Sequence, residues 1–586
     1  MNYNLNSRVA AKQKVSTYSA LRSLLQLIAH EKRNLLVALG AILLNASLNL
    51  TGPLLIGYTI DRFVQHKLYH GVLVFSGILL SMYLLGLLAS YFQTKLMGSI
   101  SQRMLFKLRN TIFGKLQSLP VAFFNDNKAG DLISRVNNDT DKINSFFSQS
   151  LMQFIGSIAT MTGAGIFLLL IHFRLGAAAL VPGLCILVFT RLASPWVKRK
   201  NAANLASVGG MSAEIQESLA NFKVIIAFNR RDYFRKRFSE ANQQNYSTAI
   251  SAGFANNVFL PVYSMFSGFA QLTVLAYGIY LISAGDFSIG LLVSYLAYAT
   301  YFYNPLRQLA SLWTSFQVAM AAWDRITVIL AMEADVPLLD NGTAEPSAAL
   351  VEFRKVKFSY DGTKEILHDI SLKLERGKTY AFVGPTGGGK TTTASLIARL
   401  YDPTTGTILL DGKDLRSYPT AERAQKIGFI LQEPFLFTGT IKENILYGNE
   451  SYQDLSDEQV QQLIIDRNLQ ELLTLFESGL QTRVTSGGDN ISLGQKQLIA
   501  FMRAVLRNPE ILILDEATAN IDTMTEQLLE EILSGLPKST TRVIIAHRMN
   551  TIENADEIFF VNAGEIIRAG SFQDAITKLL TDQRVS

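Results

Sequence analysis

One stretch, Thr379 to Leu400, most constrains what this chain can fold into. It contains the pattern G-x-x-x-x-G-K-[ST] between Gly384 and Thr391. A strand-like run, Thr379 to Val383, comes before the pattern, and a helix-like run, Thr391 to Leu400, follows. That strand–loop–helix order is the context in which the pattern forms a phosphate-binding loop. Glycines let the backbone wrap closely and point N–H groups inward, and the following helix adds its positive N-terminal end. A chance Gly-rich turn would lack these flanking elements. The stretch therefore predicts nucleotide binding.

Different residues of the predicted loop are expected to bind the phosphates and the metal ion. Lys390 is expected to reach the β- and γ-phosphates, and the Thr391 hydroxyl is expected to bind Mg²⁺. The residues expected to surround the nucleotide are Gly384, Pro385, Thr386, Gly387, Gly388, Gly389, Lys390, Thr391 and Thr392.

A second apolar run, Ile511 to Leu514, ends in two carboxylates. It is predicted to be a buried parallel strand, and ligands bind at the carboxyl ends of such strands. Asp515 is expected to hold Mg²⁺, and Glu516 to act as the general base that polarises the attacking water. Paired acidic residues at a strand end are often only a helix cap. About 120 residues after a phosphate-binding loop, however, they indicate nucleotide hydrolysis.

Two further residues are candidates with structural alternatives. His547 follows a predicted strand, Thr541 to Ile545, and sheet order should bring it near the γ-phosphate. A histidine at a strand end is more often structural. Tyr360 precedes the loop and has the right chemistry to stack on a purine base. A half-buried strand aromatic fits its spacing almost as well.

The first half of the chain is dominated by apolar segments. Each is long enough to cross about 30 Å of hydrocarbon as a helix rising 1.5 Å per residue. Six buried helices of a large soluble protein are the alternative, but the segments are nearly free of charge. The six predicted spans are Leu35–Ile56, Val72–Tyr91, Phe147–Ile171, Leu175–Ala193, Phe254–Ile282 and Ile289–Leu309.

The connections between the spans predict their orientation. Two are long, at about residues 92–146 and 194–253, look helical and carry basic runs. The positive-inside rule places them, and both chain termini, in the cytoplasm. Each contains an interruption, Phe123 to Asp131 and Glu217 to Lys223. On sequence alone these are surface turns. Leu21, Leu24, Leu25 and Ile28 predict an amphipathic helix, either on the membrane surface or packed.

Polar and aromatic residues within the spans are candidates for a cargo cavity. Asn45, Asn49 and Gln271 are intramembrane polar groups. Aromatic residues recur on two helix faces and fit either a cavity for apolar cargo or ordinary helix packing. They are Phe259, Tyr263 and Phe266 on one face, and Tyr295, Tyr298 and Phe302 on the other.

Length and composition set the outer limits. A chain of 586 residues needs at least two domains, and a net charge of +6 with basic residues flanking apolar spans suits a membrane surface better than nucleic acid. A single cysteine excludes an internal disulfide. We predict an all-α membrane domain over residues 1–332, a turn-rich linker over 333–349, and an α/β nucleotide-binding domain over 350–586.

With these motifs in place, nearly the whole chain resembles the ABC transporters, in particular exporters with six membrane helices fused to one P-loop ATPase domain. The resemblance identifies Tyr360 with the adenine-stacking aromatic and Gln432 with the Q-loop glutamine, a further metal ligand. It places Ser492, Gly494 and Gln495 in the signature motif, Asp522 in the D-loop, and makes His547 the switch histidine. The two interruptions then look like coupling helices that dock on the ATPase domain.

The same resemblance implies a dimer of twelve membrane helices, in which two ATP molecules are sandwiched and closure turns a cavity outward. Two departures favour a heterodimer. Leu493 replaces the first glycine of the usual LSGGQ signature, and Ser486 stands where a glutamate is common. Both are typical of one subunit of bacterial heterodimeric multidrug exporters. A homodimer that tolerates Leu493 remains the alternative.

The sequence thus predicts ATP-driven export of small amphipathic molecules across the cytoplasmic membrane. The alternatives are a lipid or lipopolysaccharide flippase, a peptide exporter, and an ATP-gated channel or regulator. Glu516 and His547 favour turnover over gating. The apolar spans disfavour a soluble ATPase acting on nucleic acid.

Overall fold

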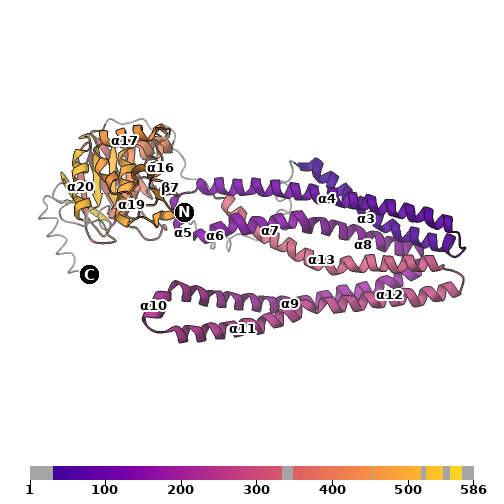
Figure 1. Ribbon diagram of the computed structural model, residues 1–586. Helices are drawn as coiled ribbons and strands as arrows, with labels where there is room; N and C mark the ends of the chain where they lie inside the picture. The colour runs from indigo at the N-terminus through magenta and orange to yellow at the C-terminus, as the bar shows by residue number, and fades with distance from the viewer. Residues whose placement is uncertain are drawn as a thin grey trace. The chain divides into compact units, whose positions relative to one another are not determined.

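The computed structural model describes residue 5 and residues 31–332, 339, 347–452, 454–515, 523–545 and 555–569. The chain separates into two compact units, each drawn in Figure 1. The helical unit comprises Val9–Gly114 and Gly130–Ala331. The nucleotide unit comprises Met1–Arg8, Lys115–Ala129 and Met332–Ser586. The predicted amphipathic helix and most of the predicted linker lie outside the described residues.

Long helices build the helical unit and contain four of the six predicted apolar spans whole. Of the other two, Phe147–Ile171 begins in the short π-helix Phe146–Ser150, and Phe254–Ile282 passes from one helix to the next at Val258. Among the described residues, five helical stretches are long and apolar enough to cross a membrane: Lys32–Val64, Tyr69–Gln117, Ala129–Ile171, Phe173–Ala220 and Arg231–Ser283. The sixth predicted span, Ile289–Leu309, is not among these five stretches, and its crossing of the membrane stays a prediction. The principal helices are α3 (Lys32–Thr59), α4 (Tyr69–Gln117), α8 (Leu151–Ile171), α9 (Phe173–Ala220), α11 (Arg231–Asn257), α12 (Phe259–Ser283) and α13 (Ile289–Leu330).

Helix α4 leaves its apolar side chains uncovered within the chain. Only 6% of its most apolar stretch is buried, against 22–28% for the other four candidate spans. Leu73, Leu80 and Leu87 are 61–72% exposed. Large apolar side chains in such a continuous row need cover from lipid or from another chain.

Helices α3 and α13 are held together at the end where α13 begins. The carboxylate of Asp61 accepts hydrogen bonds from the hydroxyl of Ser288 and the backbone N–H of Gly290. A Cβ on Gly290 would lie 2.0 Å from the carbonyl oxygen of Gly57, so only glycine permits this approach. One turn further along α13, Ser294 Oγ donates to the carbonyl of Pro53 at 2.7 Å.

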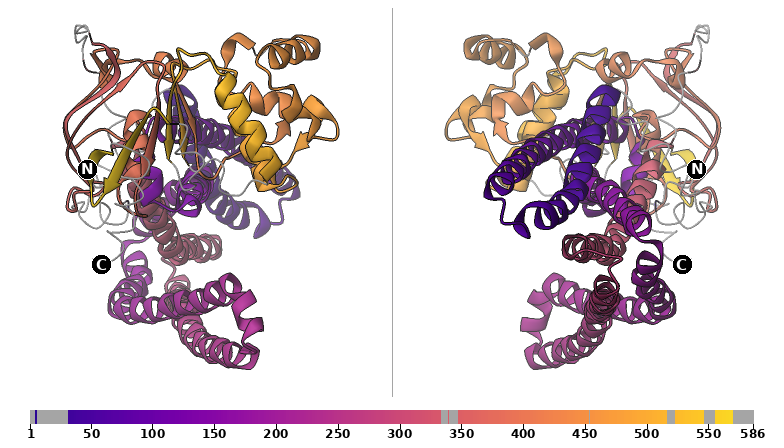
Figure 2. Two further views of the ribbon diagram at one scale, coloured as in Figure 1. Left: turned by 90° about the vertical axis from the view of Figure 1, so that its left-hand side faces the viewer. Right: turned by 90° about the vertical axis from the view of Figure 1, so that its right-hand side faces the viewer.

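The two long connections are helical, as predicted. Helix α4 continues to Gln117 and α9 continues to Ala220. Helix α11 runs back beside α9 as its antiparallel neighbour (Figure 1). Short helices interrupt them at the predicted places: α5 (Val121–Asp126), α6 (Ala129–Ser134) and α10 (Phe222–Ala227). Figure 2 shows α10 closing the end of the α9–α11 pair. Among these, α5 belongs to the nucleotide unit.

The nucleotide unit is built on two principal sheets. The six-stranded sheet has the order β12-β11-β3-β10-β9-β6, and the four-stranded sheet has the order β2-β1-β4-β5. Strands β6, β9, β10, β3 and β11 are parallel. The strands of the larger sheet are β3 (Thr379–Val383), β6 (Ile427–Ile430), β9 (Ile511–Asp515), β10 (Thr541–Ile545), β11 (Glu557–Asn562) and β12 (Glu565–Ala569). The smaller sheet contains β1 (Ala349–Phe358), β2 (Leu367–Glu375), β4 (Thr405–Leu410) and β5 (Lys413–Asp414).

Sheet register brings the predicted motifs to one edge. Ile545, the last residue of β10, pairs with Phe382 of β3 on one side and with Asp515 of β9 on the other. The phosphate-binding loop starts at Gly384, directly after β3, so it begins at the same sheet edge as Asp515, with β10 between the two strands. Strands β3 and β9 are buried along their whole length, which explains why both read as uninterrupted apolar runs.

Candidate functional site

The loop from Gly384 to Gly389 is shaped by its glycines. Gly384 has φ +147°, and a Cβ there would lie 2.0 Å from the carbonyl oxygen of Val561 in β11. Gly387 and Gly389 also have positive φ, at +81° and +116°. Helix α14 (Lys390–Ile397) starts directly afterwards, one residue earlier than predicted. The backbone thus makes the close turn that a phosphate cradle requires.

The side chain of Lys390 lies back over this loop. Its Nζ donates to the carbonyl oxygens of Gly384 at 2.8 Å and Pro385 at 3.0 Å, and the residue is only 5% exposed. A buried ammonium group held at the mouth of the loop is placed to meet negative charge. Next to it, Thr391 Oγ1 donates to Asp515 Oδ1 at 3.3 Å. A hydroxyl and a buried carboxylate side by side are hard oxygen donors of the kind that Mg²⁺ prefers.

Tyr360 is fixed beside the first turn of α14. Its hydroxyl lies 3.0 Å from Thr392 Oγ1, and its ring meets those of Phe358 and Tyr401 edge-on. The residue remains 47% exposed. An aromatic ring held at this place and still open to solvent is available for stacking on a base.

Tyr401 also connects this cluster to α5. Asn125 of α5 donates from Nδ2 to the hydroxyl oxygen of Tyr401 at 2.6 Å. Burial raises the pKa of Tyr401, so its hydroxyl stays protonated at neutral pH. A continuous row of contacts therefore runs from the interrupting helix through Tyr401 and Tyr360 to the helix that follows the phosphate loop.

The signature region caps the helix α19 (Leu493–Val505). Ser492 Oγ accepts from the backbone N–H of Gln495, and Gln495 Oε1 accepts from the backbone N–H of Ser492. Gly494 lies in the first turn and Leu493 is 40% exposed at its start. Leu493 is not among the residues with positive φ, so the backbone here does not require glycine. The leucine departs from the usual motif in side-chain size alone.

Sequence reasoning missed Arg503, which ties α19 to the Q-loop segment. Gln432 is exposed in the loop after β6. Three residues on, the carbonyl of Phe435 accepts from Arg503 at 3.1 Å, and the Asn444 carbonyl accepts from the same guanidinium at 2.8 Å. Burial lowers the pKa of Arg503. No sequence signal marked this arginine, because its partners, two backbone carbonyls and the Asn444 side-chain oxygen, lie far away along the chain.

The remaining predicted residues of this site lie outside the described residues. They are Glu516, Asp522 and His547. Their strands end at the edge described above, since Asp515 ends β9 and Ile545 ends β10.

The aromatic faces of α12 and α13 are mainly packing surfaces. Tyr295 and Tyr298 are fully buried. The Tyr295 hydroxyl donates to the carbonyls of Leu168 and His172, and that of Tyr298 donates to the carbonyl of Leu50. Tyr263 is 6% exposed and its hydroxyl pairs with Thr190 at 2.7 Å. The cavity interpretation is thus wrong for these three tyrosines.

Of the polar candidates, two line a cavity in the helical unit. Asn45 and Asn49 face it, whereas Gln271 donates to Thr300 Oγ1 at 3.3 Å and lies elsewhere. The cavity has a volume of about 280 Å³ and is formed by α3, α4, α8 and α13.

A helical unit with apolar spans, joined to a sheet unit with a preformed phosphate loop, defines a membrane-bound P-loop ATPase. Residues 35–306 match the family model for the ABC transporter transmembrane region, and residues 367–519 match the model named ABC transporter. The chain belongs to the ABC transporter family. It is a membrane-integral half-exporter that binds and hydrolyses ATP to drive export and dimerises with a second half.

Curated relatives agree with this assignment. The chain is 33% identical to an uncharacterized ABC transporter ATP-binding protein, YfiC, of Bacillus subtilis over 96% of this chain and 92% of the relative. It is 33% identical to a fatty acid ABC transporter ATP-binding/permease protein of Mycobacterium bovis, covering 85% and 78%. A multidrug resistance ABC transporter ATP-binding and permease protein of Lactococcus lactis is 31% identical, covering 82% and 81%.

Proposed function

We propose that this chain exports amphipathic small molecules from the cytoplasmic membrane, with both termini and the nucleotide unit in the cytoplasm. The observations that carry the proposal are a preformed phosphate loop in the nucleotide unit and a cavity among the apolar helices of the helical unit. The relatives named for multidrug resistance and for fatty acids support small molecules as the class of cargo. ATP-dependent accumulation of a fluorescent amphiphile in inside-out vesicles tests it. Equal accumulation with and without ATP would contradict it.

We assign the ATP site as follows. The loop residues Gly384 to Thr392 surround the phosphates, Lys390 neutralises them, and Tyr360 stacks on the base. Thr391, Asp515 and Gln432 supply oxygen ligands for Mg²⁺, which balances phosphate charge when bound. Glu516 orients and deprotonates the attacking water, and His547 contacts the γ-phosphate. Ser492, Gly494, Gln495 and Asp522 serve the nucleotide held by the partner.

The domain limits belong to the same proposal. Residues 1–332 act as the membrane domain with its cytoplasmic extensions, 333–349 as linker, and 350–586 as the ATPase domain. The membership of α5 in the compact nucleotide unit supports its role as a docking element.

Loss of the Tyr401 hydroxyl is expected to weaken communication between cargo and ATP sites. In Tyr401→Phe, the bond from Asn125 disappears while the ring contacts with Tyr360 persist. A neutral hydrogen bond contributes about 1 kcal/mol, so the stimulation of ATPase activity by cargo should fall about fivefold. ATP affinity should stay within about twofold of the parent. The measurement is ATPase rate against cargo concentration in liposomes.

Asn125→Ala removes the other partner of the same bond and provides the matched variant. The double variant should be no worse than either single one, because both remove one interaction. Unchanged stimulation in all three would exclude this contact as a coupling element.

We favour a heterodimer in which this chain supplies the working Glu516 and its partner supplies a regular signature. Ser492 and Gln495 keep the helix cap intact here, so only the bulk of Leu493 distinguishes this signature. A side chain 40% exposed at a helix N-terminus obstructs the approach of a phosphate. A homodimer with two such sites is the alternative.

Leu493→Gly is therefore expected to tighten ATP binding at the site opposite this signature, by about threefold or more, because backbone N–H groups become accessible to phosphate. Titration of the purified dimer with a fluorescent ATP analogue measures this, with Leu493→Ala expected to be intermediate. An affinity that does not respond to side-chain size would favour the homodimer. Mass determination of the purified dimer identifies its composition independently.

A further inference from the structure

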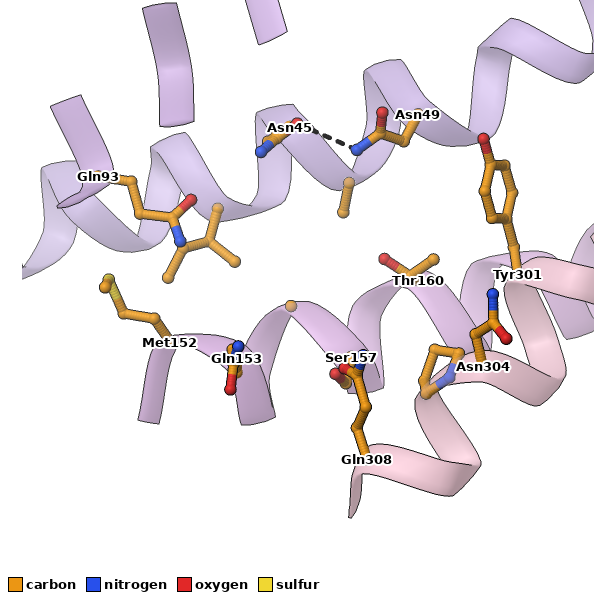
Figure 3. A pocket seen from close by; sticks show the side chains of 14 residues that line it. Asn45, Asn49, Gln93, Met152, Gln153, Ser157, Thr160, Tyr301, Asn304 and Gln308 are labelled. Carbon is orange, nitrogen blue, oxygen red and sulfur yellow. Dashed lines mark hydrogen bonds between the residues drawn. The ribbon is translucent and has the colours of Figure 1, made fainter. Parts of the chain in front are cut away.

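The cavity of the helical unit has an unusual lining for a membrane-spanning region. Six carboxamides converge on it from four helices, with two hydroxyl side chains and one phenol beside them (Figure 3). No lining residue is acidic, basic or histidine. The polar lining residues are Asn45, Asn49, Gln93, Gln153, Ser157, Thr160, Tyr301, Asn304 and Gln308.

These amides are largely free to bind something. Between lining side chains, the hydrogen bond from Asn49 Nδ2 to Asn45 Oδ1, at 3.0 Å, is the one found in the described part of the chain. Gln153, Asn304 and Gln308 are exposed within the chain. An unpaired amide is costly in hydrocarbon and is retained where it faces a water-filled or cargo-filled space. Figure 3 shows Asn45 and Asn49 on one side of such a space and Thr160 and Ser157 on the other.

The position of the cavity points to the cytoplasmic half of the membrane. Tyr301 and Gln308 lie 12 and 19 residues along α13 from Ile289, about 18 and 29 Å at 1.5 Å per residue. With the orientation proposed above, α13 begins on the outer side. An amphiphile entering from the inner leaflet would meet this level first.

Size and polarity together suit a head group. About 280 Å³ lies just below the range of roughly 300–1,000 Å³ typical of small-molecule pockets. The apolar lining residues Ile42, Ala46, Met152 and Pro305 come from α3, α8 and α13 and lie among the amides. A polar head group therefore fits against the amides while its methylene groups contact the apolar residues between them.

The uncharged lining of the cavity indicates which head groups it can bind. A buried cation or carboxylate needs an opposite charge to offset its desolvation, and this lining offers none. Each carboxamide instead presents a donor and an acceptor, which matches hydroxyl and amide groups. We propose that the cavity selects amphiphiles with uncharged, multiply hydrogen-bonding head groups over cationic and carboxylate ones. This inference rests on the proposed export of amphipathic molecules and narrows its cargo class.

Binding of four amphiphiles with the same 12-carbon chain tests the selection. They are dodecyl glucoside, an N-dodecanoyl glycine amide, dodecyltrimethylammonium and dodecanoate, each radiolabelled and below its micelle concentration. The full dimer is placed in lipid nanodiscs as its Glu516→Gln variant, so that binding is read without turnover. The glucoside, the amide or both should bind at least about tenfold tighter than the two charged compounds. Equal or tighter binding of either charged compound would overturn the proposal.

Single substitutions locate the effect. Asn49→Leu and Asn304→Leu should each weaken binding of the neutral compound about tenfold, because a donor and an acceptor are lost. Asn304→Asp should gain about tenfold in affinity for dodecyltrimethylammonium. Gln317→Leu, an exposed amide of α13 outside the cavity, is the control and should change nothing. Weakening by Gln317→Leu equal to that by Asn304→Leu would also refute the site.

Failure of this inference and failure of the export proposal are distinguishable. ATP-driven transport of a charged amphiphile with no preference for neutral head groups would refute only the selection. Tight neutral binding that Asn49→Leu weakens, without any ATP-driven transport, would uphold the site and refute export. Purification of each variant as the intact dimer, together with ATP binding, shows that both units are folded.

Discussion

Glu516→Gln is expected to reduce steady-state ATP hydrolysis by about 10²- to 10³-fold while ATP binding is retained. A positioned general base contributes about 10²–10⁴-fold to a rate, and glutamine keeps the shape of glutamate without its basicity. Residue 516 follows Asp515, whose carboxylate accepts from Thr391 at the phosphate loop. Phosphate release measures hydrolysis, and a fluorescent ATP analogue measures binding.

Glu531→Gln provides the matched control, because Glu531 lies exposed on helix α20 (Thr523–Gly535), where a lost carboxylate should leave the rate unchanged. Transport must fall together with hydrolysis in the Glu516 variant. Full hydrolysis by that variant would mean that the partner subunit supplies the working carboxylate, the reverse of the asymmetry proposed above.

A second large effect is expected of Gly384→Ala, which should weaken ATP binding by at least about 100-fold. The added methyl group would lie 2.0 Å from the backbone carbonyl oxygen of Val561, and φ of +147° is a region that only glycine enters readily. Backbone cannot move aside as a flexible side chain does, so the loop must distort. Two such costs, each of about 1–3 kcal/mol, account for the magnitude.

Gly387→Ala separates the two contributions. Its φ of +81° is also left-handed, but the space around its Cβ position is open. This variant should therefore lose only about tenfold in ATP affinity. Nucleotide-induced shifts of the melting temperature measure both, alongside melting without nucleotide. Equal losses in the two variants would show that the contact with Val561 is unimportant.

Sequence alone predicted the parts of the site whose local pattern is unambiguous. The strands Thr379–Val383 and Thr541–Ile545 are confirmed to the residue, because a fully buried parallel strand leaves a short apolar run between polar ends. The long helices were predicted in two parts. Hydropathy indicated the apolar spans, and the helical pattern of the long connections indicated their polar continuations, as in α9 to Ala220.

Other features depend on neighbours that a single stretch cannot reveal. Tyr295 and Tyr298 recur at helical spacing whether they face a cavity or a backbone carbonyl, and the opposing helix decides. The amides at 93, 153, 304 and 308 are unremarkable one by one, and only the packing of four helices brings them together. Arg503 acts on carbonyls about 60 residues away along the chain, which no motif encodes.

The clasp formed by Asp61 with Ser288 and Gly290 restricts how this chain changes shape. Hydrogen bonds from Ser294 to the carbonyl of Pro53 and from Tyr298 to that of Leu50 continue the connection along α3 and α13, so the two helices move as one body. Widening of the amide-lined cavity must then come from movement of α4 and α8 against the α3–α13 pair, because α3 and α13 do not separate at the end held by Asp61. Asp61→Ala would remove this connection and allow the adjoining ends of α3 and α13 to separate.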